Sequence, residues 1–358
     1  MTPNLNAPAE ALYQCVKNLP IVSPHGHCDA SWFAKNTAFS NPAELLVTPD
    51  HYVFRLLYSN GISLADLGIG APGKHANPRE VFKIFAAHWH LFLGTPTRVW
   101  LDYVLRQTLQ ITAELSSETA NLIYDQIAER LTQDAFRPRA LFESFNIETL
   151  ATTDSALDDL CHHAAISASG WTGRVLPTFR PDGVLDPSDP NFQTNLQELE
   201  KITGIALDSY AGYLKALRVR RGFFIQMGAT ATDHAIEAIH TEWLYDPHAI
   251  YQRLKQGRGS PDDARRFYGH MLIEMAQMSV EDGLSMQIHG GSRRNTNRKI
   301  LQDYGRDMGA DIPVVSNWVT GLDSLLNRVG NEPNLTIILF TLDETTYARE
   351  LAHMAGHW

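Results

Sequence analysis

The sequence has few cysteines, and they are not arranged to form a framework. Its 358 residues include 3 cysteines, Cys15, Cys28 and Cys161, an odd number spread widely along the chain. A disulfide framework needs pairs of cysteines, and a CxxC zinc site needs two thiols close together, so neither is indicated. We expect reduced thiols.

Long apolar runs and runs of like charge are also missing. The longest strongly apolar run, Leu335–Phe340, is far too short to cross a bilayer, and the opening MTPNLNAPAE has no positive segment leading into an apolar one. Thirty basic and 40 acidic side chains leave a net charge of −10, without a basic face that would bind phosphate. These absences predict a soluble cytoplasmic protein that binds neither nucleic acid nor membrane. A homo-oligomer is compatible with them.

What the sequence does contain is a repeated pattern of short β-rich runs that end in polar clusters, with helical segments between them. This order is typical of parallel βαβ units, whose functional groups collect at the carboxyl ends of the strands. It predicts an α/β fold of the (β/α)₈ TIM-barrel type. The runs are Ile21–Ser23, Ile147–Leu150, Arg174–Leu176, Leu284–Ile288 and Leu335–Phe340, with a weaker candidate at 228–234 after the helical pattern Val219–Met227.

One long stretch interrupts this pattern. Between the first and second runs the sequence favours helices, at Pro78–Leu93, Val99–Leu109 and Glu118–Leu131, bounded by turn signals. We expect a helical insertion at 30–145 that covers the functional face of the barrel. Residues 1–29 would hold the first strand, and 146–358 the remaining units of the same domain.

The cluster after the first run, PHGHCDA at residues 24–30, carries two histidines two positions apart. In an extended segment residues i and i+2 point the same way, so His25 and His27 could converge on one cation, and Gly26 allows close approach. Cys28 would face the other side and pack. We therefore expect His25 and His27 to bind one divalent metal, most plausibly zinc.

A second pair of the same spacing, His88 and His90, shows that the motif also arises without a metal. It lies in a helical pattern, where residues i and i+2 diverge by about 200°. We interpret this pair as structural.

Several motifs, taken in order, resemble the uronate isomerase (glucuronate isomerase) family of the amidohydrolase superfamily. The resemblance covers nearly the whole chain. It implies a distorted (β/α)₈ barrel that interconverts D-glucuronate with D-fructuronate and D-galacturonate with D-tagaturonate. The motifs are the His25-Gly26-His27 turn, Asp50-His51-Tyr52 followed by Arg55, Thr178-Phe179-Arg180-Pro181-Asp182, Thr232-Asp233-His234, and Met286-Gln287-Ile288-His289 followed by Arg294, Asn295 and Asn297.

Such a reaction moves a proton from C2 to C1 and needs groups that shuttle hydroxyl protons, a task that suits Tyr and His. The resemblance implies that role for His51 and Tyr52. From the residues alone, the same stretch is equally a helix start capped by Asp50.

A uronate also carries a carboxylate, which calls for a guanidinium fork or the metal. Arg180 is the first candidate, because it lies just beyond a strand and precedes a proline that holds the chain extended. Arg294 and Asn295 are second candidates. The alternatives are a surface arginine and a solvated basic turn.

Three further residues end strand-like segments. His289 closes an apolar run and matches a family active-site position, so we expect it to be catalytic; a core histidine is the alternative. Asp233 and His234 are either catalytic or a structural pair. Asp343 and Glu344 could provide a base, but their segment departs from the family pattern.

The sequence stops at Trp358 after six strand candidates. The family's closing portion supplies a tryptophan-rich loop and, after the eighth strand, an aspartate for the metal. The resemblance therefore leads us to expect that the last strands are missing. Two other functions stay open: a metal-dependent hydrolase of the same superfamily, and a truncated non-catalytic remnant that binds sugar acids.

Overall fold

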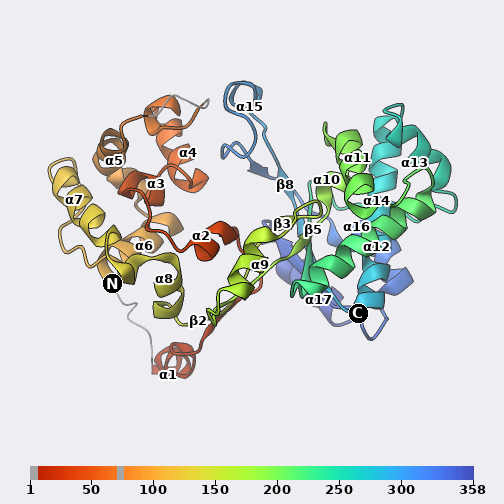
Figure 1. The fold of residues 1–358 in the computed structure, drawn as a ribbon, viewed down its shortest axis with the longest axis horizontal. Coiled ribbons are helices and arrows are strands. Elements are labelled where there is room, and N and C mark those ends of the chain that lie inside the picture. The colour runs from red at the N-terminus through yellow and green to blue at the C-terminus, as the bar shows by residue number, and fades with distance from the viewer. Residues whose placement is uncertain (1–6, 71–75) are drawn as a thin grey trace. The chain divides into compact units, whose positions relative to one another are not determined.

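The computed structural model describes residues 7–70 and 76–358, and Figure 1 labels many of its elements. The chain divides into two compact units. The sheet unit comprises residues 1–35, 141–290 and 316–358. The helical unit comprises residues 36–140 and 291–315.

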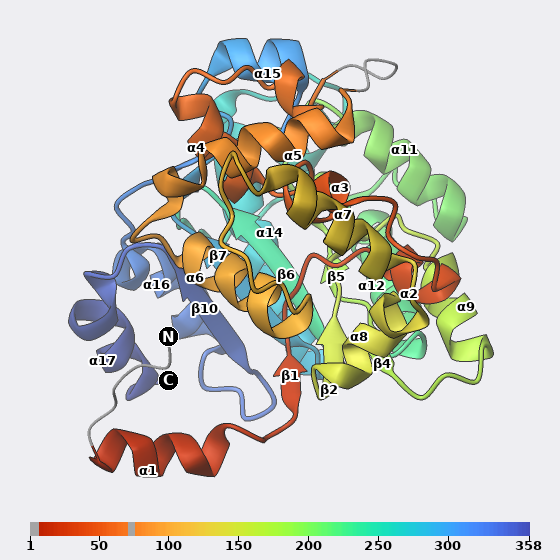
Figure 2. The same cartoon turned by 90° about the vertical axis from the view of Figure 1, so that its left-hand side faces the viewer.

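The sheet unit is built on parallel strands. They pair in the orders β1-β2-β4 and β10-β7-β6-β5-β3, and every pair in these two sheets is parallel. Figure 2 shows β7 lying between β6 and β10. The strands are β1 (Ile21–Ser23), β2 (Ile147–Ala151), β3 (Asp154–Ser155), β4 (Arg174–Leu176), β5 (Phe179–Arg180), β6 (Ala231–Ile236), β7 (Ser285–Gly290) and β10 (Ile337–Thr341).

Two of these strands are continuations of others across a short break. Pro177 separates β4 from β5, and a proline has no N–H to give to a ladder. Backbone bonds nevertheless run through the break, from Thr152 N to Leu176 O at 2.9 Å and from Asp154 N to Thr178 O at 3.1 Å. The predicted α/β fold with six successive parallel segments is therefore confirmed.

The closed TIM barrel is not confirmed. Among the described residues, β1 pairs only with β2 and β10 pairs only with β7, so this parallel arrangement has two open edges. Closure requires a ladder between the first and last strands of a sheet. Periodicity along a sequence identifies strands but does not report which edges meet.

Helices bury the apolar face of these strands. Phe224 of α12, Met275 of α14 and Leu325 of α16 join Met286 and Ile288 of β7 in one core cluster. No helix in the described part of the chain combines the length and apolar character needed to cross a membrane. The helices of this unit are α1 (Ala7–Val16), α2 (Ala30–Lys35), α9 (Cys161–Ala168), α10 (Asp182–Leu185), α11 (Phe192–Thr203), α12 (Tyr210–Gln226), α13 (His248–Lys255), α14 (Pro261–Asp282), α16 (Trp318–Val329) and α17 (Ala352–Ala355), with a π-helical turn, η5 (Tyr347–Leu351). Helix α8 (Pro138–Ser144) crosses the boundary between the units.

The helical unit begins its helices where the sequence has capping signals. Asn77 accepts a bond from Arg79 N before Pro78, and Thr95 accepts one from Arg98 N before Pro96. The three predicted helical patterns are confirmed as α5, α6 and α7 with short irregular turns. The elements are α3 (Pro42–Leu46), α4 (His51–Ser59), η1 (Ala65–Leu67), α5 (Pro78–Ala87), η2 (Trp89–Phe92), α6 (Pro96–Tyr103), η3 (Val104–Thr108), α7 (Ala120–Leu131), η4 (Asp134–Phe136) and α15 (Arg298–Tyr304).

A second segment, 291–315, belongs to the helical unit although it follows β7 in the chain. It carries the antiparallel pair β8 (Ser292–Arg293) and β9 (Ile312–Pro313). The sequence does not indicate that this segment joins the helical unit, because the rest of that unit, residues 36–140, lies more than 150 residues earlier. The bounds 30–145 for an insertion stay a prediction.

Two glycines in helices of the sheet unit offer a matched test of how closely these helices pack. A Cβ on Gly321 of α16 would lie 2.4 Å from Ile239 O, whereas a Cβ on Gly222 of α12 meets nothing within 4 Å. We expect Gly321→Ala to lower the free energy of unfolding by about 1–3 kcal/mol through overpacking. Gly222→Ala should raise it by up to about 1 kcal/mol. Urea titrations measure both, and equal changes would contradict the described close approach.

Candidate functional site

The turn after β1 is fastened to the end of β2. Thr153 Oγ1 donates to Gly26 O at 2.9 Å, and a Cβ on Gly26 would lie 2.9 Å from Ala151 O. Glycine is therefore required by close backbone approach rather than by a left-handed conformation. The close approach holds His25 and His27 with their Nε2 atoms 3.1 Å apart, and the binding of one metal by this pair stays a prediction.

Strands β6 and β7 bring two more candidate metal ligands close to His25. Asp233 of β6 and His289 of β7 come from adjacent parallel strands, and His289 Nδ1 lies 2.6 Å from Asp233 Oδ1. One ligand atom from each of His25, Asp233 and His289 lies within 4.8 Å of the others. These three side chains, which we call the ligand cluster, can hold a metal ion.

The chemistry of the ligand cluster fits a divalent cation. Three of its buried polar atoms lack a hydrogen-bond partner: His25 Nδ1, Asp233 Oδ1 and His289 Nδ1. A buried polar atom without a hydrogen-bond partner costs free energy of folding. The 2.6 Å contact between His289 Nδ1 and Asp233 Oδ1 does not have the alignment of a hydrogen bond. A shared cation would satisfy both atoms.

Electrostatics favour the protonation states that a metal needs. Burial lowers the pKa of His25 to about 4, so its imidazole is neutral at pH 7. Burial alone would raise the pKa of Asp233, but His289, Arg180 and His25 outweigh it and hold that pKa below its usual value. One carboxylate together with two imidazoles is a donor set that suits zinc.

Phe340 at the end of β10 lies flat against the ligand cluster. Its ring stacks on His289 with centroids 4.2 Å apart and planes at 12°, and it lies 5.9 Å from the ring of His25. The stacking restricts rotation of the His289 ring. Sequence reasoning missed Phe340, because a phenylalanine that ends an apolar strand carries no chemical signal.

Arg180 lies beside the ligand cluster and faces two carboxylates of the protein. Its Nε donates to Asp182 Oδ2 at 2.8 Å, and its Nη1 lies 3.5 Å from Asp233 Oδ2. A quarter of the side chain is exposed. The guanidinium predicted to bind substrate therefore also pairs with a candidate ligand.

His234 does not join the ligand cluster. Neighbouring strand residues face opposite sides of a sheet, and His234 lies on the side of Thr232, with its Nε2 3.0 Å from Thr232 Oγ1. It is fully buried, and this burial lowers its pKa to about 3. These contacts suit the structural alternative for His234, whose role stays a prediction, whereas Asp233 belongs to the ligand cluster.

His51 and Tyr52 lie in the helical unit, at the start of α4. Asp50 caps this helix by accepting a bond from Tyr52 N at 2.8 Å, as the structural alternative predicted. The two rings lie 4.4 Å apart, and the Tyr52 side chain is about half exposed. Their catalytic role stays a prediction.

Arg294 and Asn295 also lie in the helical unit, in the segment after β8. Asn295 adopts a left-handed conformation with φ 53°, and its N–H donates to Asp311 Oδ1 at 2.8 Å. Arg294 Nη1 lies 3.6 Å from Asp307 Oδ1. These contacts shape the local turn, and the substrate-binding role stays a prediction.

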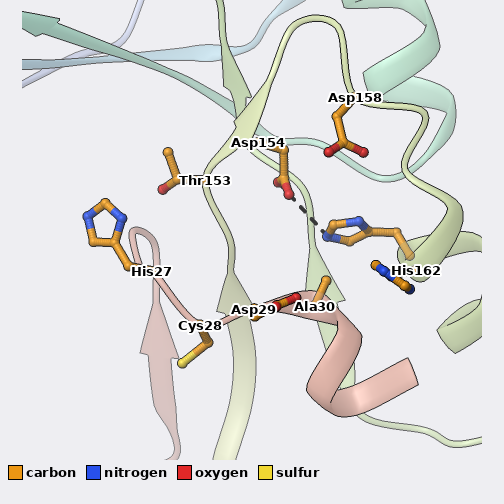
Figure 3. A pocket seen from close by; sticks show the side chains of 9 residues that line it. His27, Cys28, Asp29, Ala30, Thr153, Asp154, Asp158 and His162 are labelled. Carbon is orange, nitrogen blue, oxygen red and sulfur yellow. Dashed lines mark ion pairs between the residues drawn. The ribbon is translucent and has the colours of Figure 1, made fainter. Parts of the chain in front are cut away.

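A polar pocket of about 240 Å³ has His27 as part of its wall (Figure 3). Its far side carries a buried polar group in which Asp154 Oδ2 lies 3.9 Å from His163 Nε2, with Thr152 Oγ1 bonded to both residues. Carboxylates and imidazoles of this kind suit hydroxyl groups of a ligand. The remaining lining residues are Cys28, Asp29, Ala30, Thr153, Asp158 and His162.

Comparisons with known proteins agree on one family. The family model described as glucuronate isomerase matches residues 4–358. The uronate isomerase of Rhizorhabdus wittichii is 51% identical over 99% of this chain and 76% of its own, and that of Rhizobium meliloti is 50% identical over 97% of this chain and 75% of its own.

Solved structures show the same likeness. The crystal structure of glucuronate isomerase from Caulobacter crescentus aligns with a TM-score of 0.94 and 48% identity, covering 97% of this chain and 73% of that one. Uronate isomerase from Thermotoga maritima aligns with a TM-score of 0.89 and 26% identity, covering 96% of this chain and 75% of that one. These matches extend over nearly the whole of this chain and about three quarters of each relative, and the expectation of missing last strands is not borne out.

The ligand cluster makes a direct prediction about metal content. Changing both His25 and His27 to alanine removes the paired imidazoles, and we expect bound zinc to fall from about one ion per chain to background. The matched control changes His88 and His90, whose rings are 6.3 Å apart outside the ligand cluster. Elemental analysis of the purified proteins measures both, and equal zinc in the two double variants would exclude a site at the His25-Gly26-His27 turn.

Proposed function

Because the chain belongs to the glucuronate isomerase family, we propose that it is an isomerase that interconverts D-glucuronate with D-fructuronate and D-galacturonate with D-tagaturonate. The observation that carries the proposal is the match of one family over nearly every residue, together with a ligand cluster formed by the turn after β1 and by the adjacent parallel strands β6 and β7. Functional groups of parallel α/β folds collect towards the carboxyl ends of the strands.

In the proposal, His25, Asp233 and His289 hold a divalent metal, with His27 beside them, and zinc is the ion that their donor atoms suit. When bound, such an ion polarises a carbonyl or hydroxyl oxygen of the substrate. Asp233 forms an ion pair with Arg180, and its lowered pKa keeps its carboxylate negatively charged.

The reaction also needs groups that move protons between C2, C1 and the hydroxyl oxygens. We assign this task to His51 and Tyr52, with Arg294 and Asn295 as substrate-binding residues. The polar pocket beside His27 supports binding of a hydroxylated ligand, because Asp154 and His163 offer hydrogen-bond partners to hydroxyl groups.

The other functions receive less support. A hydrolase of the same superfamily and a non-catalytic sugar-acid-binding remnant are not favoured, because the relatives that match over most of this chain are isomerases by name. Cytoplasmic location and a homo-oligomer stay predictions.

The proposed activity is tested by incubating the zinc-loaded protein with D-glucuronate and, separately, with D-galacturonate. We expect each aldose to be converted to its 2-keto isomer, with the C2 proton exchanging for deuterium in heavy water as the enediol-like intermediate forms. Proton NMR follows both changes. A zinc-loaded protein that leaves both sugars unchanged would overturn the proposal.

Arg180 gives a test of carboxylate recognition. Its guanidinium can form a planar fork with the substrate carboxylate, which an ammonium cannot reproduce. We expect Arg180→Ala to raise KM for uronates about 10-fold or more, and Arg180→Lys to recover only part of the loss. Arg174→Ala, at the exposed start of β4, is the matched control and should leave KM unchanged. Kinetics of Arg180→Ala that equal those of the control would remove Arg180 from the substrate site.

A further inference from the structure

Asp182, the first residue of α10, gathers donors from three different elements. Arg180 Nε donates to its Oδ2 at 2.8 Å, the N–H of Ala235 in β6 donates to both oxygens at 3.2–3.3 Å, and Tyr268 Oη of α14 donates to its Oδ1 at 3.4 Å. The Asp182 side chain is about one-fifth exposed. Within the described residues, no metal-ligating group includes Asp182.

The bond from Ala235 replaces a missing strand partner. In the part of the chain that the structure describes, β5 pairs with β6 only at Phe179 and Thr232, so β6 has no β5 partner beyond that point. Asp182 accepts the N–H that a strand carbonyl would otherwise accept. Ala235 is two residues after Asp233, so this bond anchors the part of β6 that carries the candidate ligand.

The Arg180 guanidinium completes the connection. It joins the carboxylate of Asp182 to that of Asp233 through Nε and Nη1. Asp182 thus restrains Asp233 twice, through the β6 backbone and through a charged side chain. Removal of the Asp182 charge would free the guanidinium to turn towards solvent or to neutralise Asp233 more fully.

We propose that Asp182 is a positioning residue that orients Asp233 for metal binding through Arg180 and the Ala235 N–H. The inference rests on the proposed metal site. Removal of a group that hydrogen-bonds to a metal ligand and orients it typically weakens metal binding 10–100-fold. Asp182 is not one of the three residues of the ligand cluster.

Zinc affinity of the full chain, measured by competition with a chromophoric chelator, tests the proposal without relying on turnover. We expect Asp182→Asn to weaken zinc binding 10–100-fold, because asparagine keeps an acceptor for Ala235 but loses the charge that holds Arg180. Asp186→Asn is the matched control just after the same short helix, where the carboxylate accepts bonds from the N–H and Oγ of Ser188, and it should bind zinc as the parent does.

A second control separates positioning from general stability. Gly321→Ala, whose added Cβ would press on Ile239, is expected to destabilise the sheet unit and to leave zinc affinity unchanged. Zinc affinity of Asp182→Asn equal to that of the parent would overturn the proposal. A parent chain that binds no zinc would overturn the metal site and this inference with it, whereas failed isomerisation by a zinc-binding parent would overturn only the proposed reaction.

A double-mutant cycle tests the route through Arg180. Arg180→Gln alone should also weaken zinc binding, and Asp182→Asn should add little in that background, because the two residues act as one unit. Fully additive losses would overturn the route. If Asp182→Asn fails to fold, Arg180→Gln carries the test, and unchanged zinc affinity in that variant would overturn the proposal.

Discussion

The parallel register of β6 and β7 is the constraint on which the candidate site depends. It pairs Ala235 with His289, so that Asp233 and His289 point to the same side of the sheet and their polar atoms meet at 2.6 Å. A slip of one residue would turn one of the two away and bury it among apolar side chains. The core residues Met286 and Ile288 hold the register, because the same slip would expose them.

The same alternation explains why local patterns predicted some of the site and not the rest. The strands, the convergence of His25 with His27 and the contribution of His289 follow from short-range spacing. The sequence could not distinguish Asp233 from His234, because neighbouring strand residues face opposite sides of the sheet and the sequence does not say which side carries the site. The helix-facing core decides the phase, and that contact lies far away in the chain.

Residues that act through distant partners were outside the reach of sequence reasoning. The sequence indicates Asp182 only as part of the Thr178–Asp182 motif, because its partner Ala235 lies 53 positions later. Phe340 and Thr153 are ordinary strand and loop residues until their neighbours are known. Barrel closure belongs to the same class, because it depends on which strand edges meet rather than on any stretch of sequence.

The balance of buried charge connects the candidate metal with the candidate substrate. One guanidinium, Arg180, serves two carboxylates, Asp182 and Asp233, which leaves a single excess negative charge. Burial raises the pKa of Asp182 to about 6, so this excess is largely present at neutral pH. A divalent ion bound there would reverse the excess to a single positive charge, and the carboxylate of a uronate would then neutralise it. In this arrangement the metal makes the site attractive to a sugar acid, and a neutral sugar of the same shape would leave the positive charge without a partner.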